Sequence, residues 1–537
     1  MPRQATEEPD VTSPTRDFHL PGRSAVFARN GACATSHPLA AKVALDILAR
    51  GGNAMDAAIA GAVLLGVCEP HMCGIGGDCF VLASREGEAE VIGLNGSRRA
   101  PAAADAARLR ERGIEAVPLH AAEAVTIPTA IDGFLRLLGD HGRIGVDAVL
   151  APSIRYFDEG VPVAPRVAHD WPTYAKALHP AARGHFLPGG RAPRVGEIFA
   201  LPGQAEVLRR IARDGRDGFY AGEVAEDMLA ALSDAGGVHT ADDLAAAAGE
   251  YCAPISTDYR GTELIELPPN GQGAAALLML NILSHFHLAA MDPFGAERVH
   301  LEAEAAKLAY DARNRFIAEG GGRLDHMLNP ATAEALAALI DPARPMADPA
   351  PLTEAIHRDT IYITVVDRDR MAVSLIYSLF HPFGSGIASP RFGIMLQNRG
   401  AGFSLAEGHP NEMAPGRRPL HTIIPGMLRR EGRVVMPFGV MGGAYQAAGH
   451  ARFVSNFVDY GMDLQAAIDA PRSFPEAGAL RLERGYGDAV AAELAAMGHR
   501  IERPEGPIGG AQAIWIRGDG VLEAASDGRK DGCALGC

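Results

Sequence analysis

The sequence of 537 residues lacks the features that mark membrane-bound, secreted and nucleic-acid-binding proteins. No run approaches the roughly 20 consecutive apolar residues of a membrane-spanning helix, and the run 54–67 is too short. The first 30 residues are polar and have no apolar core of the kind found in signal peptides. The net charge of −15 argues against a nucleic-acid-binding surface. We therefore expect a cytoplasmic protein with no membrane and no nucleic-acid partner.

Cysteine is also scarce and forms no recognisable binding site. The cysteines are odd in number, and their spacing matches no zinc-binding pattern. Those near the glycine-rich run Gly74–Gly77 are expected to be buried, unreactive thiols. That run lacks the strand and helix context of a nucleotide-binding loop, so it is interpreted as a structural turn. The pair His285 and His287 is interpreted as a helix or loop feature, and we expect neither a metal nor a cofactor.

What the chain does contain is typical of a large globular protein with mixed α and β structure. Hydrophobic residues make up 47% and charged residues 21%, which is enough apolar material for one large or two ordinary domains. We predict a helix over 38–50, capped by Ser36 and ended by Gly51. Asn53 is predicted to cap a second, more apolar helix that continues to Val67.

Two segments of the chain are predicted to be loosely packed, and the second of them precedes a predicted hairpin. Residues 1–30 are predicted to form a disordered or loosely packed lead. The stretch of about 324–359 is rich in proline and is predicted to be mobile, apart from a short helix over 331–340; the alternative is an ordinary surface loop. The β-branched runs 360–366 and 372–379 then predict a hairpin that is apolar enough to lie between layers.

Thr360 is the candidate catalytic residue of this sequence. It follows the proline-rich segment and opens the first β-branched run, while Phe383-Gly384-Ser385-Gly386 and Met441-Gly442-Gly443 lie further along. This combination indicates a precursor that cuts itself between Asp359 and Thr360 and then uses the new terminal threonine as its nucleophile. A terminal threonine carries its own general base, because its α-amine titrates near pH ~8. The alternative is an ordinary strand threonine.

Several further motifs occur in a fixed order along the chain. They are Ser36-His37-Pro38-Leu39-Ala40, Gly51-Gly52-Asn53-Ala54-Met55-Asp56, Glu69-Pro70-His71-Met72-Cys73-Gly74-Ile75-Gly76-Gly77, Gln397-Asn398-Arg399, Arg418-Pro419-Leu420 and Gly442-Gly443. Together with the Thr360 segment, they resemble the γ-glutamyltransferase family from about Ser36 to the C-terminus. The resemblance implies an α+β fold of the N-terminal-nucleophile hydrolase type, a four-layer αββα sandwich with two antiparallel sheets inside. Cleavage would give a large subunit, 31–359 after the lead, and a small subunit, 360–537, held as one folded unit that is able to form a homo-oligomer.

The resemblance also implies roles for individual residues. Thr360 would attack the carbonyl of Asp359 during processing and the amide of a small-molecule substrate during turnover. Gly442 and Gly443 would offer backbone N–H groups to the oxyanion, although a tight turn is the alternative. Ser378 stands where the family usually has a second threonine, and its hydroxyl can take the same role.

Departures from the family pattern concern the substrate. The family's acid that pairs with a substrate ammonium is replaced by Gly402, Phe380 stands where an asparagine is usual, and Arg399 replaces a glutamine or glutamate. The sequence therefore predicts that the site has lost an anion and gained a cation. An ammonium in such a site would lose a contact worth roughly 1.5–3 kcal/mol.

The residues for a substrate carboxylate differ as well. The family's arginine aligns with Ser97, and Arg98 follows, although neighbours on a strand point to opposite faces. A serine pair of the family is His421-Thr422 here.

Arg399, His421 and Thr422 therefore indicate a small acid without an α-amino group, a pattern similar to the oxamate amidohydrolase branch. Arg399 is predicted to clamp the substrate carboxylate by two contacts. The alternatives are a structural ion pair for Arg399 and a structural hydrogen bond for His421.

These patterns favour a self-processing amidohydrolase that acts on oxamate or a related oxalyl amide. A γ-glutamyltransferase or glutathione hydrolase with a rearranged pocket is the main alternative. An acylase of secondary metabolism and an unprocessed relative that only binds ligands are further alternatives.

Overall fold

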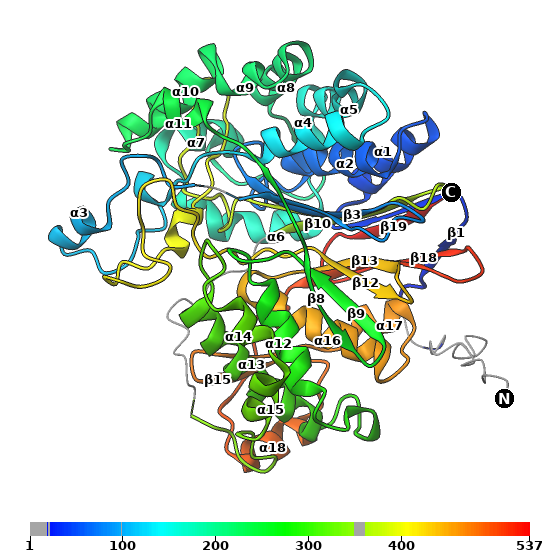
Figure 1. Ribbon diagram of the computed structural model, residues 1–537. Coiled ribbons are helices and arrows are strands. Elements are labelled where there is room, and N and C mark those ends of the chain that lie inside the picture. Colours follow the sequence, from blue (N-terminus) through cyan, green and yellow to red (C-terminus); the bar gives the residue numbers. More distant parts are fainter. Residues whose placement is uncertain (1–18, 20–21, 98, 348–359) are drawn as a thin grey trace.

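The computed structural model describes residue 19 and residues 22–97, 99–347 and 360–537. Two seven-stranded antiparallel sheets face each other in the centre, and helices cover their outer faces (Figure 1). This is the α+β, four-layer αββα arrangement predicted from the sequence. None of the helices in the described residues combines the length and the apolar character that crossing a membrane requires.

The first sheet has the strand order β1-β18-β17-β13-β12-β9-β8, and the second has the order β19-β2-β10-β11-β3-β4-β7. Strands of the first sheet are β1 (Val26–Ala28), β8 (Ile255–Tyr259), β9 (Thr262–Glu266), β12 (Gly426–Arg430), β13 (Arg433–Met441), β17 (Gly510–Ile516) and β18 (Leu522–Ser526). Strands of the second are β2 (Gly31–Thr35), β3 (Asp78–Ser84), β4 (Ile92–Gly96), β7 (Glu250–Cys252), β10 (Ile361–Asp367), β11 (Ala372–Ser378) and β19 (Cys533–Gly536). All residues of β10 and β11 are buried, which explains why both strands are apolar without alternation.

One group of helices covers the outer face of the second sheet (Figure 1). It includes α1 (Pro38–Ala49), α2 (Ala54–Cys68), α4 (Ala130–His141) and α5 (Val146–Glu159). Asn53 and Asp56 form the capping box that starts α2, as predicted for Asn53. The predicted cap of α1 is wrong by one residue: His37 accepts the N–H of Leu39, while the Ser36 hydroxyl donates to Glu69.

A second group covers the outer face of the first sheet (Figure 1). It consists of α12 (Gly273–Leu283), α13 (Ala296–Phe316), α14 (Leu324–Leu328), α15 (Pro330–Ala337), α16 (Gln446–Val458), α17 (Leu464–Asp469) and α18 (Asp488–Met497). The other helices are α3 (Ala106–Glu111), α6 (Pro165–Tyr174), α7 (Pro180–Phe186), α8 (Pro202–Asp214), α9 (Asp217–Tyr220), α10 (Gly222–Asp234) and α11 (Ala241–Ala245). Small sheets form from β5 (Val161–Pro162) with β6 (Ile198–Phe199), and from β14 (Ser473–Glu476), β15 (Ala479–Leu482) and β16 (Ile501–Glu502).

Two of the predicted loose segments are more ordered than expected. The lead was predicted to extend to residue 30, but Val26–Ala28 pairs with β18; residues 1–18, 20 and 21 lie outside the described residues. The stretch after residue 324 was predicted to be mobile apart from a helix over 331–340. The helix α15 confirms that exception, whereas α14 was not predicted and buries Met327 in the core. That burial outweighs the proline content. Residues 348–359 lie outside the described residues.

Candidate active site

Thr360 lies directly before β10, at an end of the second sheet, and is only 1% exposed. The antiparallel register pairs Ile361 with Tyr377, so Thr360 lies opposite Ser378 one step further along. Ser378 in turn pairs with Asp78 on β3. Residues directly opposite each other on adjacent strands point to the same face. Thr360, Ser378 and Asp78 are therefore neighbours on one face of the sheet.

A glutamine that the sequence analysis did not select lies beside the candidate nucleophile. Gln446 Nε2 is 3.4 Å from Thr360 Oγ1, and its Oε1 accepts the N–H of Ile424 at 2.9 Å. The side chain is completely buried at the start of α16. The fixed amide orients a donor toward the Thr360 hydroxyl. The signal in the sequence is weak, since it is only a glutamine shortly after a glycine pair.

The predicted oxyanion residues form a tight turn between β13 and α16. Gly442 and Gly443 have φ values of 128° and 57°, a region that favours glycine. The Gly442 carbonyl accepts the N–H of Tyr445, and the Gly443 carbonyl accepts Gln272 Nε2 at 3.0 Å. Within the described chain, no hydrogen bond uses the N–H of Gly442 or Gly443. Both the turn and the donor function are therefore compatible with this geometry.

Arg399, Asp78, His421 and Thr422 form a buried polar cluster. Arg399 Nε and Nη2 each lie 3.1 Å from an oxygen of Asp78, and Nη1 donates to Thr422 Oγ1 at 3.2 Å. His421 Nε2 lies 2.7 Å from Asp78. Because His421 Nδ1 accepts the N–H of Ile423, its proton is on Nε2, which donates to Asp78. Burial lowers the pKa of Arg399, and Asp78 opposes that shift.

This cluster corrects the predicted role of Arg399. The two-point contact of its guanidinium is made with Asp78 and not left open for a substrate, so the alternative of a structural ion pair describes what the structure shows. Asp78 also supplies a carboxylate, so the site has not simply exchanged an anion for a cation. The sequence analysis missed Asp78, although a carboxylate directly after Gly76-Gly77 at the start of a buried strand was a usable signal.

Of the other predicted residues, those that the structure describes lie around this cluster. A Cβ atom at Gly402 would lie 2.8 Å from the carbonyl oxygen of Leu420, so an acidic side chain does not fit there without a shift. The Phe380 ring lies against Arg399, with 4.1 Å between Cζ and the ring centre. Ser97 Oγ donates to the side chain of Asn270, and the backbone carbonyl of Asn270 accepts the N–H of His421. Ser97 is therefore linked to the cluster through Asn270. Arg98 and Asp359 lie outside the described residues.

Gln272 connects the polar cluster to the glycine turn. Its Nε2 donates to the carbonyls of Thr422 at 2.6 Å and Gly443 at 3.0 Å, and its Oε1 accepts Arg313 Nη1 at 2.9 Å. Because the amide contacts both segments, it fixes the turn at Gly442 and Gly443 relative to Thr422. This second buried glutamine was also not identified from the sequence.

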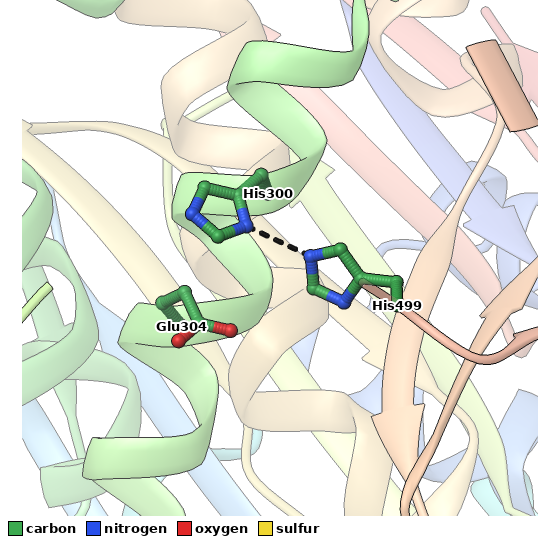
Figure 2. A group of neighbouring side chains, drawn as sticks. All are labelled: His300, Glu304 and His499. Atoms are coloured by element: carbon green, nitrogen blue, oxygen red, sulfur yellow. Dashed lines mark hydrogen bonds between the residues drawn. The ribbon is translucent and has the colours of Figure 1, made fainter. Parts of the chain in front are cut away.

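One group of side chains has the composition of a metal site, away from Thr360. The ligand atoms of His300, Glu304 and His499 lie within 4.8 Å of one another, as Figure 2 shows. His300 Nδ1 lies 2.8 Å from His499 Nε2, while both Glu304 oxygens accept hydrogen bonds from Lys307 and the N–H of Met346. All three groups are thus engaged within the protein, where they connect α13 to the segments around Met346 and His499.

Comparison with known proteins agrees with this architecture. Residues 40–537 match the family model described as gamma-glutamyltranspeptidase. The glutathione hydrolase-like YwrD proenzyme of Bacillus subtilis (strain 168) is 34% identical over 93% of this chain and 97% of the relative. The oxamate amidohydrolase proenzyme of Klebsiella pneumoniae is 34% identical over 96% of this chain and 99% of the relative.

A solved structure shows the same fold over nearly the whole chain. The crystal structure of cephalosporin acylase from Bacillus halodurans superposes with a TM-score of 0.90 and 37% identity, covering 98% of this chain and 99% of that one. The chain belongs to the γ-glutamyltranspeptidase family and is a hydrolase of that family.

Proposed function

We propose that the protein is a self-processing amidohydrolase with Thr360 as its nucleophile. The observation that carries this proposal is the position of Thr360 directly before β10, where continuation of the strand register leads to Ser378, and beside Gln446 Nε2. In processing, the threonine oxygen attacks the carbonyl of Asp359 and the peptide C–N bond breaks, which leaves an ester. Water then hydrolyses the ester and frees the α-amine of Thr360. The products are the large and small subunits of one folded unit.

In turnover, the freed α-amine takes the hydroxyl proton as Thr360 attacks the amide carbon of a substrate. The N–H groups of Gly442 and Gly443 stabilise the oxyanion, a contribution of about 3 kcal/mol for one donor. The C–N bond then breaks, and the α-ammonium returns the proton to the leaving amine. Water hydrolyses the acyl-enzyme, which releases the acid and regenerates Thr360.

The proposed substrate is oxamate or a related oxalyl amide. Arg399 Nη1 and the Thr422 hydroxyl, 3.2 Å apart, are the groups of the cluster that would meet a small carboxylate, because Asp78 occupies the rest of the guanidinium. The closed space at Gly402 disfavours the family's usual acidic partner for an ammonium. The similarity to an oxamate amidohydrolase proenzyme supports the same substrate.

A γ-glutamyl amide is the second candidate substrate, and Asp78 favours it. This carboxylate lies in the cluster beside Thr422 and supplies the negative charge that an α-ammonium requires. Relatives described as glutathione hydrolase proenzymes match about the same share of this chain as the oxamate amidohydrolase proenzyme does. One of them is 30% identical over 95% of this chain. In this case Arg399 would have to release part of its contact with Asp78.

Release of ammonia from oxamate, compared with hydrolysis of a chromogenic γ-glutamyl anilide, separates the two candidates. We expect oxamate turnover by the processed protein and none by Thr360→Ala. Thr422→Val removes one hydroxyl at nearly constant volume and is expected to raise the KM for oxamate while self-cleavage continues. Hydrolysis of the anilide with inert oxamate would replace the first candidate by the second.

A further inference from the structure

A cavity of about 340 Å³ borders the turn at Gly442 and Gly443, the proposed oxyanion turn, from the side of α6. Gly442 and Tyr445 line it together with Gly509 and part of α6. Its volume lies within the range of about 300–1,000 Å³ that is common for ligand sites. Ammonia, the leaving group of oxamate, needs no such space beside the oxyanion turn. The cavity therefore has room for a larger group attached to the amide nitrogen.

Lys530 brings a buried cation to this cavity. The residue is only 5% exposed and lines the cavity wall. Its stem crosses Gly510, where a Cβ atom would lie 3.1 Å from Lys530 Cγ. Gly510 pairs with Met441 across β17 and β13, so the stem passes one residue from Gly442. Among the described residues, none forms an ion pair or a hydrogen bond with the Lys530 ammonium.

The other charged groups of the cavity are largely paired with one another. Arg166 Nε lies 2.7 Å from Asp170, and Arg481 pairs with Glu476. Glu505 is exposed at the rim, and no ion pair joins it to Lys530. After these pairings, Lys530 is the buried charge that lacks a counter-ion in the part of the chain that the structure describes.

The charge of Lys530 affects the pKa of two nearby buried carboxyl groups. Burial raises the pKa of Glu69 and Lys530 acts in the opposite direction. Burial also raises the pKa of Asp170, but His71, Arg166 and Lys530 together hold it below its usual range. Neither carboxylate comes within ion-pair distance of the ammonium among the described contacts. An incoming carboxylate would thus find a desolvated cation, a setting in which charge-assisted hydrogen bonds are strong.

We infer that this cavity is a leaving-group subsite in which Lys530 binds a carboxylate carried by the amine half of the substrate. The inference rests on the proposed function and deepens it, since it names the substrate class as amides of amino acids or short peptides. Gly442 places the scissile carbonyl at the cavity wall, and the leaving amine extends toward Lys530. The chemistry is unchanged: the C–N bond breaks, and the amine leaves with the proton from the Thr360 ammonium while its carboxylate stays bound.

The test compares substrates that differ only in this carboxylate. N-oxalylglycine is compared with N-oxalylglycinamide, and γ-glutamylglycine with γ-glutamylglycinamide, so that either acyl group is covered. For the wild-type enzyme, the acid of the accepted pair is expected to have a kcat/KM at least tenfold above its neutral amide, since one charge-assisted contact is worth about that much or more. Lys530→Met is expected to abolish this preference by raising the KM for the acid, whereas Lys530→Arg keeps part of the preference.

The outcomes separate this inference from the proposed function. If the wild-type enzyme hydrolyses acid and amide of a pair equally well, or if Lys530→Met keeps the preference, the subsite assignment is wrong while the amidohydrolase stands. If none of the four amides is hydrolysed but ammonia is released from oxamate, the subsite is also rejected. If neither these amides nor oxamate is hydrolysed, the proposed function itself fails. The wild-type comparison needs no variant, so it decides even if Lys530→Met does not fold.

Discussion

Replacement of Asp78 by asparagine tests whether the buried cluster depends on charge. Asp78 accepts Arg399 Nε and Nη2, each at 3.1 Å, and His421 Nε2 at 2.7 Å, and all three side chains are completely buried. Asparagine keeps the size but leaves the guanidinium without a counter-ion. Removal of one member of a buried pair costs about 3–5 kcal/mol, so we expect the free energy of unfolding to fall by that amount.

Urea unfolding of the uncleaved Thr360→Ala chain measures this loss, because the two halves cannot separate in that background. A double-mutant cycle with Arg399→Met should show coupling of at least about 2 kcal/mol, since removal of both charges leaves no unpaired ion. Asp369→Asn is the matched control: it removes an exposed partner of Arg143 and should cost less than about 1 kcal/mol. A loss at Asp78 as small as in the control, or simple additivity with Arg399→Met, would refute the reasoning.

Three further predictions concern the site and its surroundings. Gly442→Ala, at a φ of 128°, should displace the oxyanion N–H and lower kcat about 100-fold. Gly408→Ala, at an open turn position with a φ of 74°, is the control for backbone strain. Equal kcat values for Gly442→Ala and the wild type in steady-state assays would contradict this prediction. Ser378→Ala should slow both self-cleavage and turnover roughly tenfold, and Ser378→Thr should restore them, as followed by intact mass and ammonia release. Burial raises the pKa of Asp527, but its arginine partners, Arg472 among them, hold that pKa at about 2, below the usual value for an aspartate. Its stabilising effect is therefore present above about pH 4 and lost toward pH 2, so the difference in unfolding free energy between wild type and Asp527→Asn should shrink by about 2 kcal/mol as the pH falls.

Local signals in the sequence predicted the elements that position Thr360. The capping side chain of Asn53 and the glycines before it mark the start of α2, and the β-branched runs on either side of residues 368–371 mark β10 and β11. In each case the signal depends on neighbours in the chain. The layered α+β arrangement came from the family resemblance and is confirmed by the two facing sheets.

The contacts that decide substrate binding could not be read in the same way. Asp78 and Arg399 are separated by 321 positions, and nothing near either residue indicates that the acid occupies the guanidinium. Gln446 reaches Thr360 across 86 positions for the same reason. The helix α14 was not predicted, because its apolar residues are buried by tertiary contacts with α12 that the sequence around residue 324 does not reveal.

The most direct test of the account is the intact mass of the purified protein after prolonged incubation. The account predicts two fragments from the wild-type chain, cut between Asp359 and Thr360, and a single chain of 56.4 kDa from Thr360→Ala. A wild-type chain that stays whole, or a Thr360→Ala chain that is cut at the same bond, would contradict the assignment of Thr360 as the nucleophile.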